Sequence, residues 1–244
     1  MQVLIVSDIH SNLVALEAVF EDAPSGLPVW CLGDVVGYGP NPNECVKVLR
    51  DLDAKCVVGN HDYAVMNKVD VQDFNPDAQR SVLWTQDELT PENMDYLENL
   101  PLSLVEGDFT LVHGSPREPV WEYILYPPIA RLNFAYFNTT ACFVGHTHVP
   151  VIFRFESRNG ERVCESEQFV EGGPQPLGGG RLIVNPGSVG QPRDGDARAS
   201  YAILDTEEKS IEYRRVQYDI AKVQKLMDEA DLPQRNIMRL SYGW

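Results

Sequence analysis

An acid and a histidine stand two positions apart where the first apolar segment of the chain ends. The segment is Val3 to Val6, and Asp8 and His10 follow it. Four apolar residues without alternation are typical of a strand buried on both faces. If the strand continues through Asp8 and His10, both side chains project to the same side, because strand residues alternate between faces. A carboxylate oxygen and an imidazole nitrogen could then bind one cation.

The same pattern recurs at four later points, where an apolar run is followed by Asp, Asn or His. These segments are Gly33-Asp34, Gly59-Asn60-His61-Asp62, His113-Gly114 and Gly145-His146-Thr147-His148. All five histidines of the chain fall in such segments. A lone histidine of this kind usually pairs with a backbone carbonyl, but five of five following apolar runs indicate a shared role. With Asp8, Asp34 and Asn60 they supply oxygen and nitrogen donors for two transition-metal ions, without thiolate.

The elements that must position these side chains alternate between strand and helix in the first quarter of the chain. Apolar runs near 3–6, 29–32 and 54–58 predict strands, and helical spacing predicts helices at 13–20 and 42–51. The polar segments follow the strands. A βαβαβ order of this kind predicts a layered α/β fold with its site beyond the carboxyl ends of the strands.

Three helices carry recognisable N-terminal signals. Ser11 or Asn12 can cap the first helix, and Asn41 precedes a proline at the start of the second. Asp219 is positioned to cap a last helix near the end of the chain.

The rest of the chain changes character twice. Residues 63–100 are helical in pattern and follow a candidate site directly, which favours a lid or specificity cap; ordinary packing helices are the alternative. Strands are then expected at 102–106, 109–112, 141–144, 151–157, 162–170, 182–184, 200–204 and 210–216, with a loop rich in glycine and proline at 171–180. We therefore expect one domain, 1–244, of α/β (α+β, four-layer) class: two packed mixed β-sheets flanked by helices, with a helical lid or insert at 63–100.

Composition limits the classes of function. The net charge of −16 argues against a general nucleic-acid binder or a membrane-surface protein, which would display a basic face. Five cysteines make an odd number without CxxC spacing and are typical of a reduced, cytosolic protein. No signal-peptide pattern and no apolar run near the ~18 residues of a membrane span is present, so a cytoplasmic location is expected. The acidic charge is a difficulty for an anionic substrate unless bound cations reverse it locally.

The five polar segments resemble, in order and spacing, the five sequence blocks of the calcineurin-like metallophosphoesterase superfamily. Two later segments further resemble its small bacterial and archaeal members, which include phosphodiesterases and phosphatases. They are Asn185-Pro186-Gly187-Ser188 and Gln191-Pro192-Arg193.

The resemblance implies a ligand for each block. One metal would be held by Asp8, His10, Asp34 and His148, and a second by Asp34, Asn60, His113 and His146. Asp34 would then bridge two divalent transition-metal ions. Manganese is the expected metal, with iron, zinc and nickel as alternatives.

The resemblance also implies a reaction, the hydrolysis of phosphomonoesters or phosphodiesters by in-line attack of a metal-bridging hydroxide. His61 would protonate the leaving group as general acid. Arg117 and Arg193 are candidates for binding phosphate oxygens, although either could equally be a solvated surface arginine.

Other functions fit less well. The protein serine/threonine phosphatases have GD-x-x-D-R-G in the second block, whereas residues 33–39 here lack that second acid and the arginine. Asp62 is an alternative partner for His61. A non-catalytic scaffold on the same fold typically lacks ligand histidines or the general acid, and all those positions are filled. A serine hydrolase at Ser188 would need G-x-S-x-G, and a zinc deaminase would need P-C-x-x-C.

Overall fold

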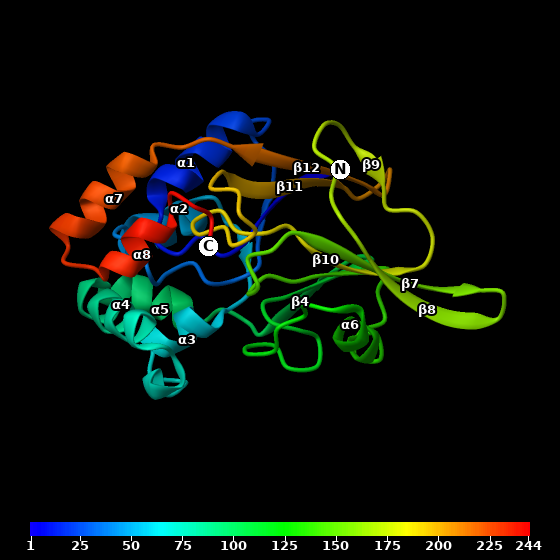
Figure 1. Cartoon of the computed structure of the whole chain (residues 1–244), viewed down its shortest axis with the longest axis horizontal. Coiled ribbons are helices and arrows are strands. Elements are labelled where there is room, and N and C mark those ends of the chain that lie inside the picture. Colours follow the sequence, from blue (N-terminus) through cyan, green and yellow to red (C-terminus); the bar gives the residue numbers. More distant parts are fainter.

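Two mixed sheets of six strands form the centre of the fold in the computed structural model, which describes residues 1–244 (Figure 1). The first sheet has the order β3-β2-β1-β11-β12-β9, made of β1 (Gln2–Val6), β2 (Val29–Cys31), β3 (Lys55–Cys56), β9 (Gln175–Pro176), β11 (Ala199–Asp205) and β12 (Ser210–Val216). The second has the order β4-β5-β6-β10-β7-β8, made of β4 (Ser103–Glu106), β5 (Phe109–Val112), β6 (Ala141–Phe143), β7 (Val151–Arg158), β8 (Glu161–Glu167) and β10 (Arg181–Asn185).

Helices cover the outer faces of the two sheets. They are α1 (Leu13–Asp22), α2 (Pro42–Asp51), α3 (Asn60–Val65), α4 (Pro76–Glu88), α5 (Pro91–Glu98), α6 (Pro127–Asn133), α7 (Ile220–Glu229) and α8 (Gln234–Arg239), with a 3-10 turn at Val71–Asp73. In Figure 1 most of them gather at one end of the molecule, while the β7–β8 hairpin projects from the other. The predicted fold class, two packed mixed sheets flanked by helices, is confirmed.

Strand β1 is buried on both faces, as its unbroken apolar run predicts. Val3 and Ile5 belong to the core between the sheets, whereas Leu4 and Val6 belong to the core beneath α1 and α2. The strand pairs in parallel with β2 and antiparallel with β11. Each fully buried side chain of this size contributes about 1.5–3 kcal/mol. The strand that leads to Asp8 is therefore held firmly on every side.

The helices of residues 63–100 share a core with the helices of the first sheet. Val82 of α4 and Leu97 of α5 are buried in the same apolar cluster as Leu16 of α1 and Leu49 of α2. Helix α8 joins them from the end of the chain, where the Asn236 side chain donates a hydrogen bond to Ser81 Oγ at 3.1 Å. This places α8 beside α4 (Figure 1).

Several local predictions were wrong in extent. Strand β1 ends at Val6, so Asp8 and His10 lie in a loop and strand alternation does not orient them. Strand β3 has two residues instead of five. The glycine- and proline-rich loop contains the short β9, and α8 was not predicted. Elements of two to six residues are too short to show periodicity, which explains these omissions.

No helix of the structure combines the length and the apolar character that crossing a bilayer requires.

Two asparagines at helix N-termini offer a matched test of stability. The Asn12 side chain accepts a hydrogen bond from Ala15 N–H at 3.1 Å and donates one to the Gly190 carbonyl at 2.9 Å, whereas Asn41 makes no side-chain cap bond. We expect Asn12→Ala to lower the free energy of unfolding by about 2 kcal/mol, because it removes a cap and leaves a buried carbonyl without its donor. Asn41→Ala should cost less than about 1 kcal/mol. Denaturant unfolding of both variants measures the difference, and equal losses would contradict this account of Asn12.

Candidate metal centre

The loops that follow β1, β2 and β6 adopt unusual backbone conformations at the polar residues. Asp8, His10 and Asp34 have φ of 52°, 49° and 51°, and His146 and His148 have φ of 65° and 58°. L-residues avoid this left-handed region at a cost of about 1–2 kcal/mol each. Strain of this kind persists only where the surrounding structure enforces it, and it concentrates at functional sites. The buried strands provide that support, and the turns gather the side chains.

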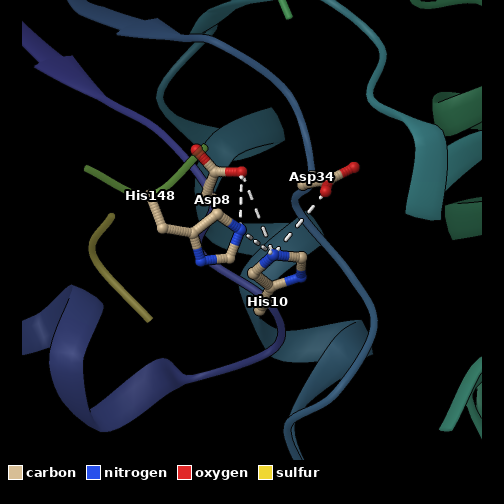
Figure 2. Close-up of side chains that lie close together, drawn as sticks. All are labelled: Asp8, His10, Asp34 and His148. Carbon is tan, nitrogen blue, oxygen red and sulfur yellow. Dashed lines mark hydrogen bonds and ion pairs between the residues drawn. The ribbon is translucent and has the colours of Figure 1, made fainter. Parts of the chain in front are cut away.

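The first group of donors consists of Asp8, His10, Asp34 and His148, all buried (Figure 2). His148 Nε2 lies 3.2 Å from Asp8 Oδ1 and 3.1 Å from His10 Nε2. His10 Nε2 lies 3.6 Å from Asp34 Oδ2. Four donor atoms from three loops therefore converge on a common point.

The second group shares Asp34 with the first and adds His113 and His146. His113 Nε2 lies 3.5 Å from the same Asp34 Oδ2 that faces His10, and 3.2 Å from His146 Nδ1. Asn60 Oδ1 is 3.1 Å from His113 Nε2. The other Asp34 oxygen accepts a hydrogen bond from the His61 backbone N–H at 2.9 Å, which orients the carboxylate between the two groups.

Backbone carbonyls fix the tautomers of the four imidazoles in these groups. Each ring has one nitrogen within hydrogen-bond distance of a carbonyl oxygen, and a carbonyl can only accept. The pairs are His10 Nδ1 with Val36 O at 3.1 Å, His148 Nδ1 with Gln191 O at 2.6 Å, His113 Nδ1 with Leu32 O at 2.8 Å and His146 Nε2 with Trp121 O at 3.2 Å. These nitrogens carry the protons, so the opposite nitrogen of each ring presents a lone pair to the site.

The lone pairs face one another without any hydrogen between them. His10 Nε2 and His148 Nε2 are 3.1 Å apart, and His113 Nε2 and His146 Nδ1 are 3.2 Å apart. Two acceptors at this distance repel unless a cation lies between them. Imidazole nitrogen with carboxylate and amide oxygen is a donor set that suits divalent transition metals. The residues present therefore fit such ions.

Burial favours the neutral form of the histidines and of Asp34. It lowers the pKa of His10 and His146 well below the usual 6.5, and burial together with nearby Arg193 lowers the pKa of His148 to about 4. The rings are therefore neutral at pH 7, which is the form that binds metal. Burial also raises the pKa of Asp34 well above 3.8, assisted by the nearby charges of Asp62 and Asp8. A bound cation would offset this repulsion between carboxylates.

Two glycines are required by the close approach of the donors. A Cβ at Gly59 would lie 2.0 Å from Asp34 Oδ1, and a Cβ at Gly145 would lie 2.1 Å from Ser7 Oγ and 2.8 Å from Asp8 Oδ2. No larger residue fits at either position without displacing a carboxylate. The glycines of the sequence blocks therefore allow the backbone to pack against the donor atoms.

His61 lies beside the donor groups and not within them. Its buried ring contacts His10, Tyr38 and Phe74 at centroid distances of 4.9, 4.4 and 4.9 Å, and its Nδ1 has no hydrogen-bond partner. Asp62 makes no hydrogen bond to the ring, and its two carboxylate oxygens accept hydrogen bonds from Val36 N–H and Gly59 N–H instead.

A pocket of about 470 Å³ opens beside the donors. It is lined by Tyr38, Asn60, His61, Asp73, Phe74, Asn75, Asp77, Trp121, Tyr123, Arg193, Arg235, Asn236 and Arg239. Of the two arginines predicted from sequence, Arg193 lies in this lining. Arg117 does not, and its guanidinium pairs with Glu122. No signal in the sequence indicated the aromatic lining residues Tyr38, Phe74, Trp121 and Tyr123, because they belong to no recognised motif. The two arginines of α8 were missed for the same reason, and α8 lies far from the five blocks in the sequence.

Comparison with known proteins identifies the family of the chain. A sequence model of the calcineurin-like phosphoesterase superfamily domain matches residues 1–209. The chain belongs to this superfamily. The resemblance seen in its five sequence blocks is thereby confirmed.

Three relatives illustrate how far the similarity extends. The crystal structure of a metallophosphoesterase from Sphaerobacter thermophilus is 46% identical, with full coverage of both chains and a TM-score of 0.89. Protein MJ0912 of Methanocaldococcus jannaschii is 41% identical over 99% of this chain and 98% of its own length. A symmetrical bis(5'-nucleosyl)-tetraphosphatase of Pectobacterium carotovorum is 28% identical over 50% of this chain and 46% of its own length. Similarity to the first two therefore covers the entire chain.

The shared position of Asp34 leads to a prediction about metal content. Asp34→Asn keeps the side-chain volume but removes the charge that faces both donor groups, so we expect it to lower metal binding at both. Elemental analysis after dialysis measures the ions retained per chain. Asp73→Asn is the matched control, because Asp73 is an exposed acid of the pocket wall outside both groups. If Asp34→Asn retained as much metal as the wild type, the shared role of Asp34 would be wrong.

Proposed function

We propose that the protein is a dinuclear metal-dependent phosphoesterase that hydrolyses phosphomonoesters or phosphodiesters. The observation that supports this best is the pair of donor groups sharing one oxygen of Asp34, next to a pocket that also contains His61 and Arg193. In this proposal Asp8, His10, Asp34 and His148 hold one divalent ion. Asp34, Asn60, His113 and His146 hold the other.

Two such ions, when bound, supply Lewis acidity at the phosphoryl oxygens and lower the pKa of water towards 7, and manganese is our first candidate. The protein itself holds the four imidazoles in neutral, fixed tautomers. It also shields all the proposed ligands from bulk water, since every one of their side chains is buried.

His61 is proposed as the general acid for the leaving group. Burial, and next the charge of Arg193, lower the pKa of His61 well below 6.5, so the ring is neutral in the absence of substrate. A phosphate dianion in the pocket counters the charge of Arg193 and favours the protonated ring. We therefore expect His61 to gain its proton together with the substrate and to donate it to the departing oxygen.

Arg193 is proposed to bind the oxygens of the reacting phosphate. Its backbone N–H donates to the His148 carbonyl at 3.3 Å, which ties it to the donor groups. Its buried Nε–H has no partner, while Nη2 donates to Gln191 Oε1 at 2.9 Å. An unsatisfied buried donor beside the site suits a phosphate oxygen. Arg117 stays a weaker candidate, because Glu122 engages it.

We also propose that residues 1–244 form one domain in which 63–100 is the helical lid of the site. Phe74, Asn75 and Asp77 of this stretch line the pocket. Its buried residues Val82 and Leu97 belong to the same core as the helices of the first sheet. The lid is thus continuous with the domain.

A metal-by-substrate panel tests the proposed activity. We expect hydrolysis of p-nitrophenyl phosphate or bis-p-nitrophenyl phosphate once manganese is added to metal-free protein, and no hydrolysis with EDTA. Iron, zinc and nickel, with nucleotides and phosphopeptides as further substrates, complete the panel. Retention of metal without turnover of any phosphate ester would support the alternative, a metal-binding scaffold on this fold.

The general acid can be tested through the leaving group. His61→Gln removes the ionisable ring but none of the proposed metal ligands, so we expect metal content to stay the same. Turnover of substrates with basic leaving groups, such as phenyl phosphate, should fall by about 10²–10⁴-fold, and p-nitrophenyl phosphate should be affected much less. Equal slowing across the series would remove His61 from this role.

A further inference from the structure

The pocket beside the donor groups has a second positively charged element in its wall. Its lining includes Asn60 and His61 from the donor segments, and Arg235, Asn236 and Arg239 from α8. A volume of about 470 Å³ falls within the ~300–1,000 Å³ of pockets that hold molecules larger than a single phosphate. The proposed hydrolysis uses none of the α8 residues.

Three of the six arginines that form no ion pair lie in this pocket. The chain has 36 acidic residues, and eight of its 14 arginines pair with a carboxylate, as Arg80 does with Asp231 and Arg198 does with Glu171. Arg193, Arg235 and Arg239 form no ion pair, although Asp73 and Asp77 line the same pocket. Three cationic side chains thus line one cavity, and none of them pairs with an Asp or Glu side chain.

The surroundings of Arg239 disfavour its positive charge. Burial, and next the charge of Arg193, lower the pKa of Arg239 to about 10, with Arg235 acting in the same direction. A bound anion would relieve this repulsion, and a guanidinium fork matches the oxygens of a phosphate in pairs. Arg239 is held in place by its Nε–H, which donates to the Trp244 carbonyl.

We infer that Arg235 and Arg239, the distal arginine pair, bind a second phosphate group of the substrate while its first phosphate lies at the metal centre beside Arg193. This inference rests on the proposed function and narrows it: the preferred substrates carry at least two phosphates on one molecule. A nucleoside diphosphate is the simplest such compound.

Comparing AMP with ADP isolates the contribution of the second phosphate, because the two nucleotides differ only in that group. We expect ADP to inhibit hydrolysis of p-nitrophenyl phosphate with an inhibition constant at least about tenfold below that of AMP, given the strength of charge-assisted hydrogen bonds. Arg235→Ala should abolish most of this advantage of ADP while leaving the constant for AMP within about twofold. Free manganese is held constant, and any binding of manganese by ADP affects all variants equally.

Two further variants test whether the effect is specific to the distal arginine pair. Arg162→Ala removes another exposed arginine without an ion pair, on β8 outside the pocket, and should leave the advantage of ADP intact. Arg239→Lys keeps the charge at the partly buried position, so it should fold and retain part of the advantage.

The result that would overturn the inference is equal inhibition by AMP and ADP in the wild type, or an advantage of ADP that survives in Arg235→Ala. Either result leaves the proposed function standing. If the protein hydrolyses no phosphate ester, the proposed function fails, and calorimetric titration of wild type and Arg235→Ala with AMP and ADP still decides whether the distal arginine pair binds a second phosphate.

Discussion

The structure depends on holding lone pairs of neutral imidazoles, and oxygens of carboxylates, closer together than they would remain by themselves. His10 and His148 present unprotonated nitrogens to each other at 3.1 Å, and a single oxygen of Asp34 faces both donor groups. This crowding is unfavourable in a protein without cations. It is sustained by strained turns at the ends of β1, β2 and β6, and these three strands, which are buried on both faces, support the turns. Core packing and metal affinity are therefore linked through the backbone of a few loops.

Much of the donor set could be predicted from sequence, because the donors occur in short blocks directly after apolar runs. Asp34 and Asn60 needed only their position after a strand to be assigned to a common edge. The geometry could not be predicted in the same way. Alternation along β1 gave an apparent reason for Asp8 and His10 to point together, but the strand ends at Val6 and left-handed turns bring them together. Pattern rules describe regular elements, and these turns are not regular.

The α8 residues of the pocket could not be predicted from sequence. Arg235 and Arg239 stand on a helix of six residues with no motif and no long apolar face. Their importance comes from the contact of α8 with α4 through Asn236, which lies 155 positions from its partner Ser81. Prediction from sequence motifs identifies the residues that we propose as metal ligands. Motifs do not identify residues that define the shape and charge of a pocket through tertiary packing.

The position of β1 has a consequence for how the protein is made. Its neighbours in the sheet are β2, which follows within the first 31 residues, and β11, which begins only at Ala199. A chain emerging from the ribosome can pair β1 on one edge early, but the other edge stays open until Ala199–Asp205 has been synthesised. During that interval Asp8 and His10 lack the loop after β10 that packs against them, in which Ser188 Oγ donates to the Asp8 carbonyl. Assembly of the metal centre is therefore a late event of biosynthesis, and an apolar strand edge must remain protected from other nascent chains until then.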